Sequence, residues 1–207
     1  MDSLPDALSL DYYTIDKTKD REAFKKVKSF APLTPEQAAG LVYFEFKDKN
    51  NQQVLKALFI IVPMSSVYTI KLEDSTGNLL GYAIPEKKPL LDMEPTKWNI
   101  YQVEQDNEKL VGIIRVKTAQ VFQGGNAAAI GSTLVTKVTN LQIEWPETKV
   151  VARFSIKGSK FDLIDLENRT ISRLTIKIGL LSSTYILEVF DHSTLNPLVV
   201  LMSALVK

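Results

Sequence analysis

Hydrophobic and polar residues alternate with a period of two along most of the chain. Such alternation is typical of β-strands that bury one face and expose the other. In the stretch VYTIKLEDSTGNLLGYAI, residues 67–84, the side chains of Tyr68, Ile70 and Leu72 share one face, and residues 74–78 contain glycine and other turn-forming residues. This stretch is therefore predicted to form a β-hairpin.

The same reasoning predicts about a dozen strands along the chain. They span residues 11–15, 41–47, 54–62, 67–73, 79–84, 97–104, 110–118, 134–144, 149–157, 160–166, 170–178 and 184–190. Further turns are predicted at residues 105–108 and near Gly158 and Asn168. Short strands at this spacing are typical of β-barrels and β-sandwiches, so the fold class is predicted to be mainly β.

Helical patterns are few. Residues 19–30 are predicted to form a short N-terminal amphipathic helix, with Ala23, Val27 and Phe30 on one side and basic residues on the other. The sequence TPEQAAG, residues 34–40, predicts a second, shorter helical turn because it combines a capping threonine, a proline at the first helical position and a closing glycine.

The segment NPLVVLMSALVK, residues 196–207, has almost no polar face. Asn196 followed by Pro197 is typical of a helix start, and Ser203 is the one polar residue between positions 198 and 206. A helix that is apolar on every side must be surrounded on every side, and about ten residues rise only about 15 Å, half of what a bilayer requires. A buried central helix is therefore predicted, with an apolar final strand as the alternative.

Two stretches resemble the tubby C-terminal-like superfamily, which includes tubby proteins, phospholipid scramblases and plant LURP-one-related proteins. Residues 171–207, ISRLTIKIGLLSSTYILEVFDHSTLNPLVVLMSALVK, resemble the family's closing strands, its short acidic turn and its central helix. Residues 68–84, YTIKLEDSTGNLLGYAI, resemble its early hairpin. The resemblance implies a closed antiparallel barrel of about twelve strands threaded by the C-terminal helix.

The resemblance also bears on function. Members of the superfamily bind phosphoinositide headgroups or are proposed to move lipids. The chain has no convincing match to the basic phosphoinositide pocket of tubby, and it lacks the cysteine-rich palmitoylation stretch and the proline-rich N-terminal arm of scramblases. No binding residue is therefore carried over from the family.

The composition is that of an ordinary globular protein, with 45% hydrophobic and 24% charged residues, and one domain spanning residues 1–207 is expected. Twenty-five basic residues against 24 acidic residues leave a net charge of +1, which gives no nucleic-acid signal. Cysteine is absent, which excludes thiolate nucleophiles, disulfides and thiolate-bound metals. Because neither a secretory signal nor a run of about 18 apolar residues is found, we expect a cytoplasmic protein that can lie peripherally on a membrane.

Three segments contain residue types that could carry chemistry. His192 is the only histidine, and its sequence FDHSTLNP favours a turn over a catalytic triad. Asp165 and Glu167 fall on one face of a predicted strand together with Leu163, which we interpret as an outward-facing polar surface rather than an acid/base pair. The glycine-rich residues 124–132 match no phosphate-binding motif and favour a surface loop. We therefore expect no enzyme activity, no cofactor and no metal site.

The segment DKTKDREAFKKVK, residues 16–28, is the best candidate for partner binding because its basic residues outnumber its acidic ones. These basic residues are Lys17, Lys19, Arg21, Lys25, Lys26 and Lys28. They predict a binding module that engages anionic phospholipid headgroups or a protein partner, with a helix packed across one barrel end as the alternative reading of the segment. The second functional hypothesis is a structural subunit of an assembly that uses an exposed sheet edge.

Overall fold

The computed structural model describes residues 6–19, 42–61, 68–86, 97–104, 107–122, 135–144, 150–157, 160–178 and 183–206. These residues form a 3-10 turn, twelve strands and a helix. The elements are η1 (Asp6–Leu8), β1 (Tyr12–Lys19), β2 (Val42–Lys47), β3 (Gln53–Ile61), β4 (Tyr68–Asp74), β5 (Leu79–Pro85), β6 (Lys97–Glu104), β7 (Asn107–Phe122), β8 (Val135–Glu144), β9 (Val150–Lys157), β10 (Lys160–Asp165), β11 (Thr170–Ile178), β12 (Ser183–Val189) and α3 (Pro197–Leu205).

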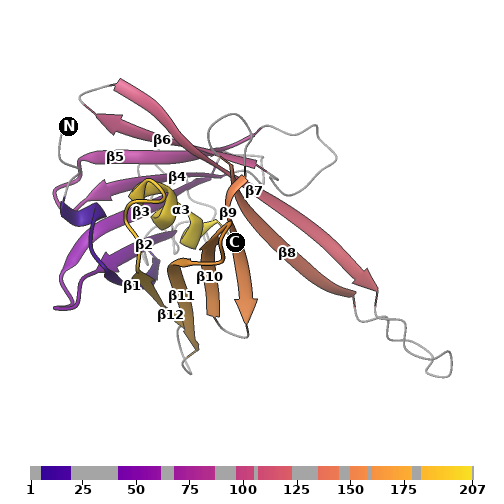
Figure 1. Cartoon of the computed structure of the whole chain (residues 1–207). Helices are drawn as coiled ribbons and strands as arrows, with labels where there is room; N and C mark the ends of the chain where they lie inside the picture. Colours follow the sequence, from indigo (N-terminus) through magenta and orange to yellow (C-terminus); the bar gives the residue numbers. More distant parts are fainter. Residues whose placement is uncertain are drawn as a thin grey trace, which may run out of the picture.

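The strands form one closed antiparallel barrel, which was one of the two mainly β architectures that the strand pattern allowed and the one that the family resemblance implied (Figure 1). Each strand pairs with the strands before and after it in the sequence. The first and last strands close the ring, with Tyr13 of β1 opposite Leu187 of β12. Closure of this kind pairs the backbone groups that the edges of an open sheet leave exposed.

The helix α3 lies inside the barrel, as its uniformly apolar sequence predicted (Figure 1). All nine of its residues are buried. The Asn196 side chain caps the helix by accepting a hydrogen bond from the Leu198 amide at 2.9 Å. Within the described residues, no helix has the length and apolar character needed to cross a membrane.

Two glycines bring the barrel wall close to α3. A β-carbon at Gly81 of β5 would lie 2.4 Å from Leu198 Cδ2 and 2.5 Å from the Tyr101 carbonyl oxygen. A β-carbon at Gly112 of β7 would lie 2.6 Å from Val199 Cγ2. The first turn of the helix therefore packs directly against backbone on two strands, where any larger residue would collide with it.

The two ends of the barrel differ. At one end, which we call the turn end, short turns at residues 48–52, 74–78 and 165–169 join consecutive strands, and the loop 190–196 leads the chain into α3. We call the opposite end the open end. There β1 and β11 finish, and β7 and β8 extend together away from the rest of the barrel (Figure 1).

The amphipathic helix expected at residues 19–30 is not supported at its start. Strand β1 continues through Lys19 instead of ending at residue 15, because residues 14–19 pair with β2 along their whole length. Lys17 and Lys19 are therefore strand residues, and the helical structure described in the N-terminal part is the 3-10 turn η1. The rest of that helix, the helical turn expected at 34–40 and the glycine-rich segment 124–132 lie outside the described residues.

Candidate functional site

Lys17 is a charged residue on the inward side of the barrel wall. Tyr13 and Ile15 of β1 point into the core, with relative exposures of 0% and 1%, and alternation places Lys17 next in the same row. Its register partner on β2 is Phe44, and the Lys17 ammonium nitrogen lies 5.9 Å from the centroid of the Phe44 ring. The Lys17 side chain itself is exposed. A cation thus stands at the open end, where the interior pattern would otherwise place an apolar residue.

A small cavity of about 150 Å³ lies beside this position. It is lined by Ile15, Phe44, Tyr185, Ala204 and Leu205, which come from β1, β2, β12 and the last turn of α3. The Phe44 ring packs 6.3 Å from the ring of Tyr185, measured between centroids. The cavity therefore has apolar walls, and we call it, together with Lys17, the open-end site.

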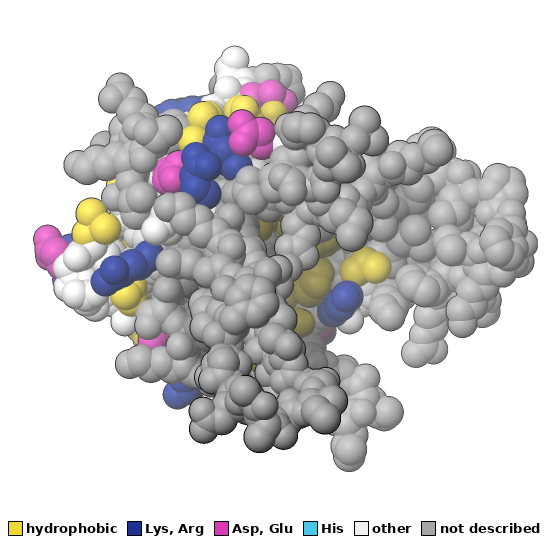
Figure 2. All heavy atoms as spheres, turned by 90° about the vertical axis from the view of Figure 1, so that its right-hand side faces the viewer, with side chains coloured by type: hydrophobic (Ala, Val, Ile, Leu, Met, Phe, Trp, Pro, Cys, Tyr) yellow, Lys and Arg dark blue, Asp and Glu magenta, His cyan; other side chains and the backbone are white. Residues whose placement is uncertain are grey.

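Figure 2 views the molecule from the side toward which β7 and β8 extend, and it shows hydrophobic and basic side chains of described residues lying close together on this side.

The acidic neighbour of Lys17 in the sequence does not neutralise it. Asp16 points to the outer face of β1, where its carboxylate accepts a hydrogen bond from Lys47 Nζ at 3.0 Å and from Thr184 Oγ1 at 3.3 Å. The hydrogen bond to Asp16 raises the pKa of Lys47 above its ordinary value. Among the described residues, no carboxylate forms an ion pair with Lys17. Within the described part of the chain, the Lys17 ammonium is therefore not neutralised by an acidic side chain.

The structure brings together only part of the basic segment that the sequence singled out. Lys17 lies at the open-end site, and Lys19 ends β1 opposite Val42. The remaining basic residues lie outside the described residues; they are Arg21, Lys25, Lys26 and Lys28. Sequence reasoning missed Phe44, whose ring Lys17 contacts, and Tyr185, which packs against Phe44, although both stand at inward positions near strand ends.

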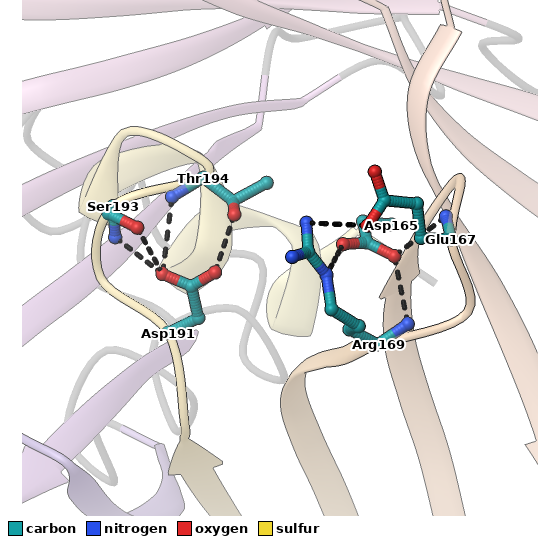
Figure 3. Close-up of polar contacts among 6 residues, drawn as sticks. All are labelled: Asp165, Glu167, Arg169, Asp191, Ser193 and Thr194. Atoms are coloured by element: carbon teal, nitrogen blue, oxygen red, sulfur yellow. Dashed lines mark hydrogen bonds and ion pairs between the residues drawn. The ribbon is translucent and has the colours of Figure 1, made fainter.

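The carboxylate pair at residues 165 and 167 does not form an outward-facing surface, and that interpretation was wrong for Asp165. Asp165 pairs in register with buried Ala152, points inward and is 4% exposed, whereas Glu167 lies in the following turn and is exposed. Figure 3 shows Arg169 reaching Asp165, with its Nε 2.7 Å from Oδ2. Burial alone would raise the pKa of Asp165, but hydrogen bonds from Arg169 and from the Glu167 amide outweigh it and lower the pKa. Asp165 is an ionised acceptor that holds a turn.

The Ser, His and Asp near residue 192 do not form a triad. His192 Nε2 lies 2.8 Å from Asp11 Oδ1, while Ser193 Oγ donates to Asp191 Oδ1 at 2.7 Å (Figure 3). The Asp191 carboxylate also accepts hydrogen bonds from the Ser193 amide and from the Thr194 hydroxyl. Hydrogen bonds from the Thr194 and Ser193 side chains hold the pKa of Asp191 well below its usual range. These contacts form the turn that the sequence predicted.

Comparison of the chain with models of known protein families and with curated protein sequences finds no match. Within the part of the chain that the structure describes, no group of three or more His, Cys, Asp or Glu side chains is placed to hold a metal ion.

Proposed function

We propose that this protein is a non-enzymatic binding module with a tubby-like barrel, and that it engages anionic phospholipid headgroups at its open end. One observation carries the proposal: the unneutralised ammonium of Lys17 stands beside an apolar cavity formed by Phe44, Tyr185 and the end of α3. A site with a positive charge beside a small apolar cavity suits the anionic headgroup of a phospholipid and the few apolar atoms next to it.

The order of residues along the chain adds to this argument. Lys19 follows Lys17 at the end of β1, and four further basic residues follow in the sequence within residues 21–28. Basic residues close to an anionic membrane surface each contribute about 1 kcal/mol to binding. A cytoplasmic protein bound peripherally to a membrane is the localisation that goes with this proposal.

Co-sedimentation of the full chain with vesicles tests the proposal. We expect binding to vesicles that contain phosphatidylserine, no binding to pure phosphatidylcholine vesicles, and weaker binding at higher salt. Lys17→Met keeps most of the side-chain length and removes the charge, so it should weaken binding about fivefold, the equivalent of about 1 kcal/mol. Lys71→Met, on the outer face of β4, is the matched control and should bind as the wild type does.

Equal binding to anionic and neutral vesicles, or no binding to either, would refute the lipid proposal. If both lysine variants lost binding equally, the interaction would be with the overall charge and not with the open-end site.

A structural role in an assembly is the second candidate, and two exposed apolar side chains favour it. Leu166 and Phe190 are 57% and 55% exposed, and they lie at the turn end, next to β11 and β12. Contiguous exposed apolar patches mark surfaces that partners cover, so this candidate requires that Leu166 and Phe190 belong to one patch. Light scattering over a range of concentrations tests this role: oligomers of the wild type that disappear in Leu166→Ser/Phe190→Ser would support it, and a monomer at all concentrations would exclude self-assembly.

A further inference from the structure

A second cavity, of about 350 Å³, lies at the turn end, on the opposite side of the molecule from Lys17. It is bounded by β7, β8, β9, the loop leading into α3 and the first turn of α3. Its lining residues are Lys109, Val111, Ile143, Val151, Thr194, Leu195, Asn196 and Val199. Five of these are aliphatic and three are polar, so the cavity is a partly open cleft with both apolar and polar walls.

A β-bulge in β7 directs Lys109 into this cavity. Ile100 of β6 pairs with Gly112, whereas the next residue, Tyr101, pairs with Leu110, so Val111 is an extra residue in β7. The extra residue reverses the alternation, and Lys109 therefore stands opposite buried Gln102 on the inward side of the wall. Without the bulge, Leu110 would take the inward position. The bulge thus places Lys109 on the cavity side of β7, where its side chain lines the cavity and stays exposed to solvent, and it turns Leu110 to the other side of the strand.

Lys109 and Asn196 supply donors at this cavity, while the Glu104 carboxylate accepts a hydrogen bond from the Nε2 of Gln102. Among the described residues, no carboxylate forms an ion pair with Lys109. The Asn196 amide lines the same cavity and is held in place because its Nδ2 donates to Gln102 Oε1 at 2.7 Å and its Oδ1 caps the Leu198 amide. One N–H of Asn196 Nδ2 is left over by these two bonds. The Lys109 ammonium and one amide N–H of Asn196 therefore lie at the wall of the same cavity.

We propose that the turn-end cavity is a binding site for a small aliphatic carboxylate, with Lys109 and Asn196 binding the carboxylate and Val151, Leu195 and Val199 enclosing the chain. The volume fits on the order of ten non-hydrogen atoms, at about 30 Å³ for each. Octanoate has this size, a single negative charge and a flexible chain. This site is separate from the open-end site, and the proposal does not depend on lipid binding there.

Titration of the full chain with octanoate, followed by amide chemical shifts in NMR, tests the proposal. We expect saturable shifts at Leu195 and Val199, and much weaker binding of 1-octanol, which has the same chain without the charge. Lys109→Met should weaken octanoate binding about tenfold or more, the loss typical of a hydrogen bond to a charged group. Lys71→Met and Lys17→Met should leave it unchanged, because both lysines lie away from the cavity.

Val151→Phe provides a second variant that fills the cavity and leaves Lys109 intact. It should abolish octanoate binding while the amide spectrum shows a folded protein. Equal affinity for octanoate and 1-octanol in the wild type would overturn the proposal without any variant. Octanoate shifts centred on the open end, or wild-type affinity in Lys109→Met, would overturn it as well.

Discussion

Three hairpins at the turn end use the same aspartate contact. In each, the first residue of a five-residue turn is an aspartate whose Oδ1 accepts hydrogen bonds from the amides two and four residues later. The fourth residue has a positive φ, 61° at Asn51, 90° at Gly77 and 64° at Asn168. Asparagine and glycine are the residues that tolerate this conformation best. The sequences DKNNQ, DSTGN and DLENR are thus three versions of one turn.

Removal of these aspartates should affect the protein unequally. Asp165 is buried and bound by Arg169, whereas Asp48 holds its turn at the surface through backbone amides and Asn50. Asp165→Ala should therefore lower the midpoint of denaturant unfolding clearly more than Asp48→Ala does. Chemical denaturation followed by tryptophan fluorescence measures both midpoints, and similar losses for the two variants would show that the burial of Asp165 has no energetic consequence.

The turn aspartates also predict acid sensitivity. Burial would raise the pKa of Asp74, but hydrogen bonds from Thr76 and Asn78 lower it to about 2, below its ordinary value of 3.8. A lowered pKa in the folded state stabilises the fold fully above the unfolded-state value, and this stability is lost as the pH falls through the folded-state value. The free energy of unfolding should therefore drop between about pH 4 and pH 2. Asp74→Asn should reduce this dependence, and an unchanged pH profile would contradict the assignment.

At the scale of elements, glycines set the distance between α3 and the barrel wall. Gly112→Ala should destabilise the fold by about 1–3 kcal/mol, because its new methyl group meets Val199. Val199→Ala in the same chain should recover part of that loss, since the methyl group at Gly112 collides with a side chain. Gly81→Ala should recover less when combined with Leu198→Ala, because the Tyr101 carbonyl oxygen still blocks the new methyl group.

Double-mutant cycles from chemical denaturation measure this difference. Gly112→Ala and Val199→Ala together should destabilise the fold less than the sum of their separate effects. Gly81→Ala combined with Leu198→Ala should still lower the free energy of unfolding through the clash with the Tyr101 carbonyl oxygen. If the Gly112 and Val199 substitutions simply added, the helix would not be in contact with β7 as described.

The strands and the central helix could be predicted from the sequence because their signals are local. The alternation of hydrophobic and polar residues identified each strand, and the sequence of α3 has no polar face that solvent could cover. The prediction failed where charged residues occupy inward positions. Lys17 and Lys19 suggested a charged helix, and Asp165 suggested an outer surface, because alternation alone does not show which strand face turns inward when a polar residue is held by a turn or stands at a barrel end.

The two candidate sites could be predicted even less. The cavity at Lys109 depends on a bulge at Val111, and Leu110 is the residue that a simple alternation would have placed inside. The cavity beside Lys17 depends on side chains from β1, β2, β12 and α3, which are distant in sequence. Sites of this kind depend on the register in which the strands pair and on the closure of the barrel, and a local sequence pattern does not predict either of them.

For the whole molecule, α3 supplies the interior of the barrel. Met202 is 0% exposed at the centre of the helix, so Met202→Ala should cost about 2–5 kcal/mol. Ile186→Ala on the outer side of β12, between inward Tyr185 and Leu187, is the control and should cost clearly less. Deletion of residues 197–207 should remove the cooperative thermal transition altogether. A truncated chain that melted at the same temperature as the full chain would show that α3 is not the core.

The position of α3 along the chain has a consequence for biosynthesis. All twelve strands precede the helix, and the first strand must wait for the twelfth before the ring can close. The ribosome therefore synthesises all twelve strands before it synthesises α3. The pairing of β1 with β12 joins segments that are distant in sequence, and such contacts form slowly. During translation the inward-facing hydrophobic side chains of the strands are exposed until α3 covers them. Exposed hydrophobic surface of this kind makes a nascent chain prone to aggregation and dependent on molecular chaperones.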